Sequence, residues 1–237
     1  MRVHVAFTPA EAASAPVGVV VDVLRATSTM AQALASGYRR VLCCAGLDDA
    51  RRLRAETPDS VVGGERDAVR VDDFDVGVSP REFLEVRAET LILSTTNGTA
   101  AIVAAAARCE TVLLGSLLNL GAVAAAVRER GEDAVVLCAG FKGAFALDDA
   151  YCAGRIVETA GGERSDAAVA AGVLARAFPD AHTGLTARTY GPPGLEEDIR
   201  FCAQESVLDV VPRLTGMAGP AAEIVAQRPV RKVVQGA

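Results

Sequence analysis

Asp22 is an aspartate in an unusual place, because it continues the apolar residues of the stretch GVVVDVLRAT, residues 18–27. A carboxylate in a buried strand is costly unless it is paired, hydrogen-bonded or bound to a metal. Arg25 follows in the predicted turn, and Thr27 and Ser28 place hydroxyls beside the N–H groups that open the next helix. An arginine at a helix N-terminus suits an oxyanion, most naturally phosphate. Asp22 is compatible with that anion if Mg²⁺ lies between them.

A purely structural role is the alternative for this first turn. Asp22 and Arg25 would then form an ion pair, and the hydroxyls of Thr27 and Ser28 would only cap the helix. The two interpretations differ in the partner of the Arg25 guanidinium, which is either an anionic ligand or Asp22.

A second polar turn, STTNGT at residues 94–99, separates an apolar strand from an Ala-rich helix. Gly98 permits a close approach of the backbone to a ligand, and Thr95, Thr96 and Asn97 can donate hydrogen bonds to an anion. Ordinary helix capping is the alternative, but it needs only one of these residues. We therefore expect this turn to bind the same anion as the first.

Further charged residues follow another predicted strand, in the stretches GGER (63–66) and FDVGVSP (74–80). Glu65 and Asp75 could join Asp22 as carboxylate ligands of the metal. Arg66 could bind a second anionic group of the ligand.

Three predicted helices begin with side chains that can cap them or serve a site. One of Asp148 and Asp149 is predicted to be an N-cap, which leaves the other for metal binding or acid–base chemistry. Lys142, in the glycine-bearing loop before them, offers a cation to an anionic ligand. Ser79 is predicted to be the N-cap of a capping box. Asp198 lies on a helix face that is harder to explain as solvated than its acidic neighbours.

Composition narrows the class of protein. The net charge of −6 argues against a nucleic-acid partner, which needs a basic face. No apolar run is long enough to span a bilayer, so no membrane partner is expected. None of the six cysteines forms a C-x-x-C pair, which favours a reducing cytoplasm over disulfides or a zinc site. The P-loop, the tyrosine-phosphatase loop, the haloacid-dehalogenase strand and the nucleophile elbow are all absent from the sequence.

The elements that must position these residues alternate between apolar runs and Ala-rich stretches, which predicts one domain over residues 1–237. The expected class is α/β, a three-layer α/β/α sandwich with a mostly parallel or mixed sheet. The predicted strands are Arg2–Phe7, Val17–Leu24, Arg40–Ala45, Ser60–Gly64, Thr90–Ser94, Thr111–Gly115 and Ala134–Ala139. The predicted helices are Ala26–Ser36, Asp48–Glu56, Pro80–Val86, Gly98–Ala107, Leu120–Glu129, Asp149–Ala160, Asp166–Ala177 and Glu196–Gln204. The C-terminal third is predicted to hold more helix and loop, with residues 188–194 as a long irregular connection.

A weak internal duplication is a further hypothesis. The segment VVVDVLRATSTMAQALASGYRRVLCC is similar in outline to ETLILSTTNGTAAIVAAAARCETVLLGS. Each has an apolar strand, a polar turn, a helix of small residues and a second apolar strand. Two βαβ units in one chain would give the same pattern without duplication.

Taken together, the stretches DVLRATST, GER, FDVGVSP, TTNGT and CAGFKGAFALDDAYCAG, in that order, resemble the 2-phosphosulfolactate phosphatase family. The ending DIRFCAQ…DVVP fits that family too, so the resemblance covers residues 19–212. It implies an α/β/α fold and a Mg²⁺-dependent acid phosphatase. The implied reaction converts 2-phosphosulfolactate to 3-sulfolactate and phosphate, on the route to coenzyme M.

Two positions depart from the family's usual residues. Val78 stands where the family often has asparagine, and Asp148 stands where it often has glutamate. The first change removes a polar group, whereas the second shortens a side chain and keeps its charge.

From the chemistry alone, Asp22, Arg25, Asp148 and Asp149 are the predicted catalytic residues, with Arg66 or Lys142 binding a carboxylate or sulfonate. The alternative function is a non-catalytic sensor of a phosphorylated or sulfonated metabolite, which the apolar Val78 keeps open. The expected partner is a small phosphorylated acid. A homodimer is expected because small α/β enzymes are often symmetric dimers.

Overall fold

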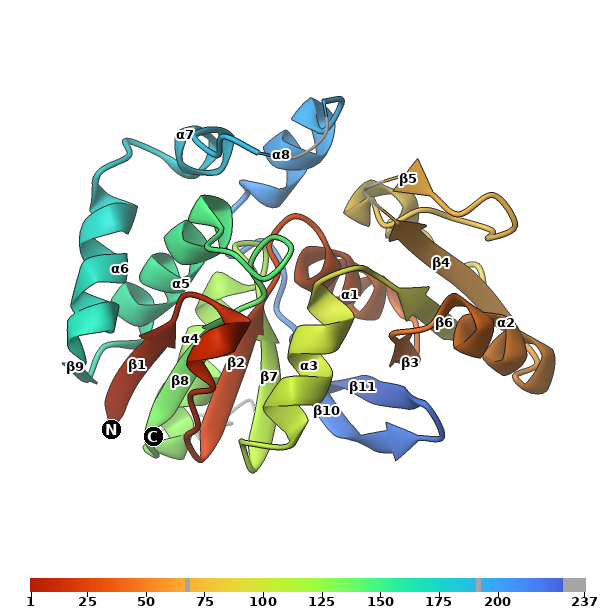
Figure 1. Cartoon of the computed structure of the whole chain (residues 1–237), viewed down its shortest axis with the longest axis horizontal. Coiled ribbons are helices and arrows are strands. Elements are labelled where there is room, and N and C mark those ends of the chain that lie inside the picture. Colours follow the sequence, from red (N-terminus) through yellow and green to blue (C-terminus); the bar gives the residue numbers. More distant parts are fainter. Residues whose placement is uncertain (67–68, 191–192, 228–237) are drawn as a thin grey trace, which may run out of the picture.

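The computed structural model describes residues 1–66, 69–190 and 193–227, whose strands and helices alternate along the chain (Figure 1). The strands are β1 (Arg2–Ala6), β2 (Val17–Val21), β3 (Arg40–Cys44), β4 (Ser60–Arg66), β5 (Val69–Arg70), β6 (Thr90–Ser94), β7 (Thr111–Gly115), β8 (Ala134–Cys138), β9 (Glu163–Arg164), β10 (Val211–Ala218) and β11 (Ala221–Gln227). The α-helices are α1 (Ala26–Ser36), α2 (Leu47–Glu56), α3 (Gly98–Ala106), α4 (Leu120–Arg130), α5 (Leu147–Ala160), α6 (Asp166–Arg176), α7 (Ala181–Thr186) and α8 (Glu196–Cys202). Two 3-10 helices are also present, η1 (Pro9–Glu11) and η2 (Pro80–Phe83).

The strands form one mixed sheet in the order β5-β4-β6-β3-β11-β10-β7-β2-β8-β1-β9. Strands β4, β6 and β3 make one parallel set, and β7, β2, β8, β1 and β9 make another. The antiparallel hairpin of β10 and β11 lies between the two sets, where it pairs with β7 on one side and β3 on the other. Figure 1 shows this hairpin in blue, to the lower right of α3.

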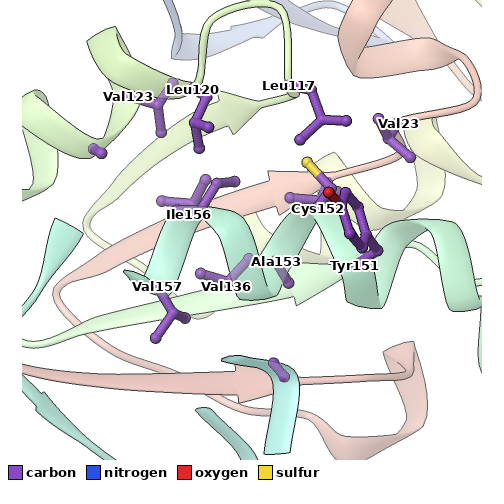
Figure 2. Close-up of a cluster of buried hydrophobic side chains, with 14 of the residues drawn as sticks. Val23, Leu117, Leu120, Val123, Val136, Tyr151, Cys152, Ala153, Ile156 and Val157 are labelled. Carbon is purple, nitrogen blue, oxygen red and sulfur yellow. The ribbon is translucent and has the colours of Figure 1, made fainter. Parts of the chain in front are cut away.

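Strand β2 is buried on both faces, as expected of a central strand between two helical layers. Val19 and Val21 belong to a core cluster with residues of α4, α5 and α6. Figure 2 shows part of this cluster, with Ile156 and Val157 of α5 among its members. Val20 points the other way, into a second cluster with residues of α1 and α3. The predicted α/β fold, with a mixed sheet between helical layers, is confirmed.

Two strand–helix–strand units cross between the parallel sets, and these sets run in opposite directions because three antiparallel pairings separate β7 from β3. The chain passes from β2 through α1 to β3, and later from β6 through α3 to β7. These units are the two segments with similar outlines. One passes from the β2 set to the β3 set and the other passes back, and the starts of α1 and α3 lie in contact. An origin by duplication stays a prediction.

The predicted strands between residues 2 and 139 are all present, with ends that differ by at most three residues. The C-terminal third holds the expected helices and loops as far as α8, but residues 211–227 form the β10–β11 hairpin, which was not predicted. Pro212 and Gly216 interrupt the period-two pattern there, and the pairing shifts register between Leu214 and Gly216. The helix predicted at Pro80–Val86 is only the short η2, and α7 was not predicted.

Within the described residues, no helix combines the length and the apolar character needed to cross a bilayer.

Candidate active site

A cavity of about 260 Å³ lies where the carboxyl ends of strands from both parallel sets meet. Asp22 follows β2 and Gly140 comes after β8, whereas Glu65 is near the end of β4 and Thr95 follows β6. Ligands of α/β proteins bind beyond the carboxyl ends of the strands, where helix N-termini begin. The residues that line the cavity are Asp22, Leu24, Arg25, Ala26, Glu65, Val78, Thr95, Thr96, Asn97, Gly140, Phe141, Lys142, Ala146, Asp148, Asp149, Arg188, Tyr190 and Leu195.

Asp22 is buried between the starts of α1 and α3. Its Oδ1 accepts a long hydrogen bond, 3.4 Å, from the backbone N–H of Ala26. A Cβ at Gly98 would lie only 2.7 Å from Asp22 Oδ2, so a glycine is required for α3 to begin this close to the carboxylate. Burial raises the pKa of Asp22 to about 7, and the charges of Asp148 and Glu65 act in the same direction.

Arg25 reaches the cavity with its guanidinium held by Asp198 of α8. Arg25 Nη1 lies 2.7 Å from Asp198 Oδ2, and both side chains are nearly buried. The hydroxyl of Ser79 donates to the other oxygen of Asp198 at 2.5 Å. The structure therefore pairs Arg25 with Asp198, whereas the structural alternative had paired it with Asp22. Ser79 occupies the N-cap position of η2 as predicted, but the capping box is wrong, because the Ser79 side chain makes no capping hydrogen bond and Glu82 accepts the N–H of Gly77.

Asp148 and Asp149, in the first turn of α5, are buried on the cavity wall. The two oxygens of Asp149 accept the backbone N–H groups of Val23 (2.9 Å) and Gly140 (3.0 Å). Asp149 thus connects the end of β2 to the loop after β8. Asp148 Oδ1 accepts the Tyr190 hydroxyl at 2.5 Å and the N–H of Asp149 at 3.0 Å. The prediction that one of the pair is the N-cap is wrong, because α5 begins before both of them.

Negative charge is costly at these carboxyl groups. Burial raises the pKa of Asp149 well above its ordinary value, and the charges of Asp148 and Asp22 raise it further. Burial also raises the pKa of Asp148, although the hydrogen bond from Tyr190 opposes that shift. Burial and the charge of Asp148 raise the pKa of the Tyr190 hydroxyl, which therefore remains a donor. The cavity is suited to a cation or to carboxyl groups that keep a proton.

Two loops meet over this part of the cavity. The ring of Tyr190 stacks on the ring of Phe141, with centroids 4.5 Å apart and planes 25° apart. Lys142 follows Phe141, and its backbone N–H donates to Asn97 Oδ1 at 3.3 Å. Arg188, two residues before Tyr190, also lines the cavity. The loop after β8 and the segment after α7 therefore place two cations on the cavity wall.

The turn before α3 lines the cavity as predicted, but much of its hydrogen-bonding capacity is used within the protein. The Thr95 hydroxyl accepts the N–H of Thr99, in the first turn of α3, at 3.2 Å. The N–H and hydroxyl of Thr96 both donate to Glu65 Oε1, at 2.7 and 2.9 Å. Glu65 is therefore oriented toward this turn, and Asn97 meets the loop that carries Lys142.

Thr27 and Ser28 do not line the cavity, although they begin α1 beside it. The Thr27 hydroxyl donates to the backbone carbonyl of Asp22 at 2.9 Å, and the Ser28 hydroxyl donates to that of Val23 at 2.8 Å. Both hydroxyls thus hold the turn between β2 and α1, but neither caps the helix as the alternative had expected.

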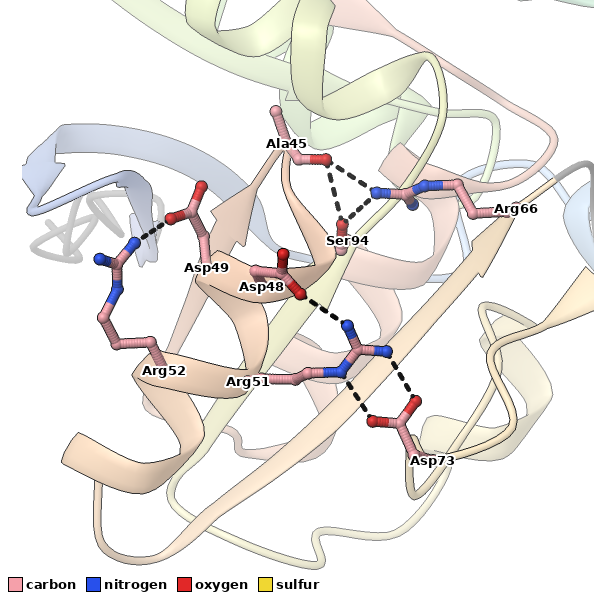
Figure 3. Close-up of polar contacts among 8 residues, drawn as sticks. All are labelled: Ala45, Asp48, Asp49, Arg51, Arg52, Arg66, Asp73 and Ser94. Atoms are coloured by element: carbon pink, nitrogen blue, oxygen red, sulfur yellow. Dashed lines mark hydrogen bonds and ion pairs between the residues drawn. The ribbon is translucent and has the colours of Figure 1, made fainter.

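Arg66 and Asp75 also lie away from the cavity lining. Arg66 Nη2 donates to the carbonyl of Ala45 at 2.8 Å and to the hydroxyl of Ser94 at 3.0 Å (Figure 3). Asp75 pairs with Arg54 at 2.8 Å, and its other oxygen accepts a backbone N–H of β4 at 2.9 Å. Both residues therefore brace the β4 region, and the structure does not bring Asp75 to the carboxylates it was predicted to join.

Arg188 and Tyr190 line the cavity but were not predicted as site residues. They lie in a stretch that was identified only as an irregular connection. An arginine and a tyrosine in a long loop are the kind of signal that could have found them, because binding residues are concentrated on loops held by a rigid scaffold. Asp198 was noted for its helix face, but its partner Arg25 lies 173 positions away in the sequence.

Comparison with known proteins decides the family. The model of a family described as 2-phosphosulpholactate phosphatase matches residues 4–217. The chain belongs to this family. A "probable 2-phosphosulfolactate phosphatase" of Thermus thermophilus is 40% identical over 233 residues, which cover 93% of this chain and 98% of the relative.

Other members of the 2-phosphosulfolactate phosphatase family give the same result. Proteins with the same name from Clostridium novyi and Carboxydothermus hydrogenoformans are 33% and 34% identical to the chain. The matches cover 82% and 90% of this chain, and 87% and 92% of the relatives. The resemblance found in the motifs is confirmed, and membership places the chain among phosphatases.

Both positions that depart from the family's usual residues line the cavity. Val78 contributes an apolar surface, and Asp148 holds the hydrogen bond from Tyr190.

Proposed function

We propose that the protein hydrolyses 2-phosphosulfolactate to 3-sulfolactate and phosphate, with Mg²⁺ as its cofactor. The observation that carries this proposal is the convergence of Asp22, Asp148 and Asp149 with Arg25 in one cavity of a phosphatase-family protein. Hydrolysis of a phosphate monoester depends mainly on positioning and on neutralising the charge of the phosphoryl group. A buried set of acids beside a fixed arginine provides groups for both.

Arg25 would bind the phosphoryl oxygens. Its guanidinium is already oriented by Asp198, so little side-chain entropy is lost when the substrate binds. The N-termini of α1 at Ala26 and of α3 beside Asn97 border the same cavity. Their backbone N–H groups and dipoles favour an anion there.

The carboxylates fit Mg²⁺ in the mode that this ion prefers with phosphate ligands. Among the described residues, no group of three or more acidic, histidine or cysteine side chains is arranged to hold a metal by itself. Mg²⁺ commonly takes one or two carboxylates and completes its shell with waters and phosphate oxygens. Asp22 with Glu65 would provide those ligands, and a divalent cation would offset the cost of burying the charge of Asp22. When bound, Mg²⁺ would supply positive charge to the phosphoryl oxygens.

Asp148 would act on the proton of the leaving group. Hydrolysis adds water to phosphorus and breaks the ester P–O bond, so the departing oxygen must gain a proton. The raised pKa of Asp148 favours a carboxyl that carries this proton, and Tyr190 fixes its orientation. Asp149, with both oxygens on backbone N–H groups, would position the loop at Gly140 rather than touch the substrate.

The test is phosphate release from a panel of phosphorylated hydroxy acids, with and without EDTA. We expect release from 2-phosphosulfolactate that EDTA abolishes and added Mg²⁺ restores. Full activity in EDTA would refute the role of the metal, and no release from any substrate would refute the enzyme.

A sensor that binds the phosphoester without hydrolysing it is the second candidate. The observation in its favour is Val78, which places an apolar side chain in the cavity where the family often has asparagine. Calorimetry separates the two functions, because a sensor would bind the intact ester tightly with no turnover over hours.

Two wider expectations belong to the same proposal. A homodimer would appear in light scattering as twice the mass of the chain. A role on the route to coenzyme M requires that 3-sulfolactate be the product, which mass spectrometry of the reaction would establish.

A further inference from the structure

Arg188 is a cation on the cavity wall that has no part in the proposed hydrolysis. Its side chain is half-buried, and within the described ranges its guanidinium makes no ion pair and no hydrogen bond. Two other arginines considered for anion binding differ from it. Arg25 is held by Asp198, and Arg66 is occupied by the carbonyl of Ala45 and the hydroxyl of a serine. Among the described residues no group occupies the donor fork of Arg188, which can therefore bind a ligand.

The segment that carries Arg188 is held in place. Two residues later, Tyr190 donates to Asp148 at 2.5 Å and stacks on Phe141. The positive charge of Arg188 lowers the pKa of Asp148, which places the guanidinium near the acid that borders the cavity. The stack also brings the loop with Lys142 to the same wall. Arg188 and Lys142 thus lie on segments that are separate from the groups proposed to bind the phosphoryl group. Those groups are Arg25 and the N-termini of α1 and α3.

We propose that Arg188 recognises a second oxyanion of the substrate, a carboxylate or a sulfonate, and so sets the preference for phosphate esters that carry additional negative charge. This inference rests on the proposed function, because it names the residue that binds the rest of the substrate. The planar guanidinium matches two oxygens of such a group with two parallel hydrogen bonds, which a lysine cannot reproduce. The role that the sequence had suggested for Arg66 passes to Arg188, since the structure turns Arg66 away from the cavity lining.

The test compares Arg188→Gln and Arg188→Lys with the wild type on three substrates. These are 2-phosphosulfolactate, the analogue without the sulfonate (2-phospholactate) and p-nitrophenyl phosphate, which has no second oxyanion. In Arg188→Gln we expect the ratio of kcat/KM between 2-phosphosulfolactate and p-nitrophenyl phosphate to fall about 30- to 100-fold, mainly through KM. Arg188→Lys should recover part of the loss. The ratio of kcat/KM between 2-phospholactate and p-nitrophenyl phosphate shows which oxyanion Arg188 binds. If Arg188 binds the carboxylate, this ratio should fall as far in Arg188→Gln as the ratio for 2-phosphosulfolactate. If Arg188 binds the sulfonate, it should stay near the wild-type value.

Arg66→Gln is the matched control, because it removes a second arginine that the sequence offered for the same role. Its substrate ratio should equal that of the wild type. The inference is overturned if Arg188→Gln slows all three substrates by one factor, since Arg188 would then act only through the charge of Asp148. Thermal melts of both variants verify folding.

Binding of the product gives a readout that does not need turnover. Calorimetry with 3-sulfolactate should show a Kd at least about 30-fold weaker for Arg188→Gln than for Arg66→Gln. If the wild type releases no phosphate but this difference is found, the proposed hydrolysis fails and the binding role of Arg188 stands. Equal binding by the two variants would overturn the role of Arg188 whatever the activity.

Discussion

Replacing Asp22 by asparagine removes a buried negative charge while keeping the shape of the side chain. The pKa of Asp22 is raised from 3.8 to about 7, chiefly by burial. At about 1.36 kcal/mol per pKa unit, this difference corresponds to roughly 4 kcal/mol. The raised pKa means that the folded protein binds this proton more tightly than the unfolded chain. The metal-free protein therefore loses stability as the pH rises from about 4 to about 7, and above that range the penalty is complete.

The expected results follow from that sign. At pH 8 without Mg²⁺, Asp22→Asn should melt about 4–8 °C above the wild type, which corresponds to about half of the full penalty because the neighbouring carboxyl groups readjust. Near pH 4 the difference should largely disappear. Mg²⁺ should raise the melting temperature of the wild type alone, by mass action, and the variant should release no phosphate. Differential scanning fluorimetry at both pH values, with and without Mg²⁺, measures all of this.

Asp75→Asn is the control, because it changes another aspartate that the sequence offered as a metal ligand. Its pairing with Arg54 lies away from the cavity lining, so the response to Mg²⁺ should be retained. The reasoning is refuted if Asp22→Asn melts below the wild type at pH 8 in both conditions while the wild type does not respond to Mg²⁺. Asp22 would then be a structural residue.

Three further variants test the geometry of the site. Gly98→Ala should lower the activity and should lower the free energy of unfolding in urea by about 1–3 kcal/mol, because a Cβ there would lie 2.5 Å from a side-chain carbon of α1. Unchanged values would contradict the close approach. Tyr190→Phe removes a hydrogen bond that lowers the pKa of Asp148, so the pKa of Asp148 should rise and the corresponding limb of the pH–rate profile should move to higher pH; an unmoved profile would show that Asp148 does not titrate in the reaction. Asp198→Ala leaves the nearly buried Arg25 without this partner and should cost about 3–5 kcal/mol of stability, with a higher KM; a loss of stability without a change in KM would limit Asp198 to a structural role.

Much of the central fold could be predicted from the chain because local patterns determine it. Strands such as Thr90–Ser94 and Thr111–Gly115 are continuous apolar runs, and helix Ala26–Ser36 ends at Gly37, whose φ of 119° suits glycine. The hairpin at residues 211–227 could not be predicted in the same way. Its strands are defined by pairing with β7 and β3, and those partners are set by the tertiary fold.

The candidate site divides along the same line. The sequence by itself determined that polar turns follow the strands at Asp22, at Thr95 and before Asp148, which is where α/β proteins bind ligands. Only the tertiary structure decided which charged groups meet there. Arg25 pairs with Asp198 across 173 positions, Arg66 turns to Ala45, and Arg188 comes to the cavity because Tyr190 bonds to Asp148. The physical reason is that the sequence of a turn shows which side chains it contains. The direction of a long charged side chain depends instead on partners that the fold brings from distant parts of the chain.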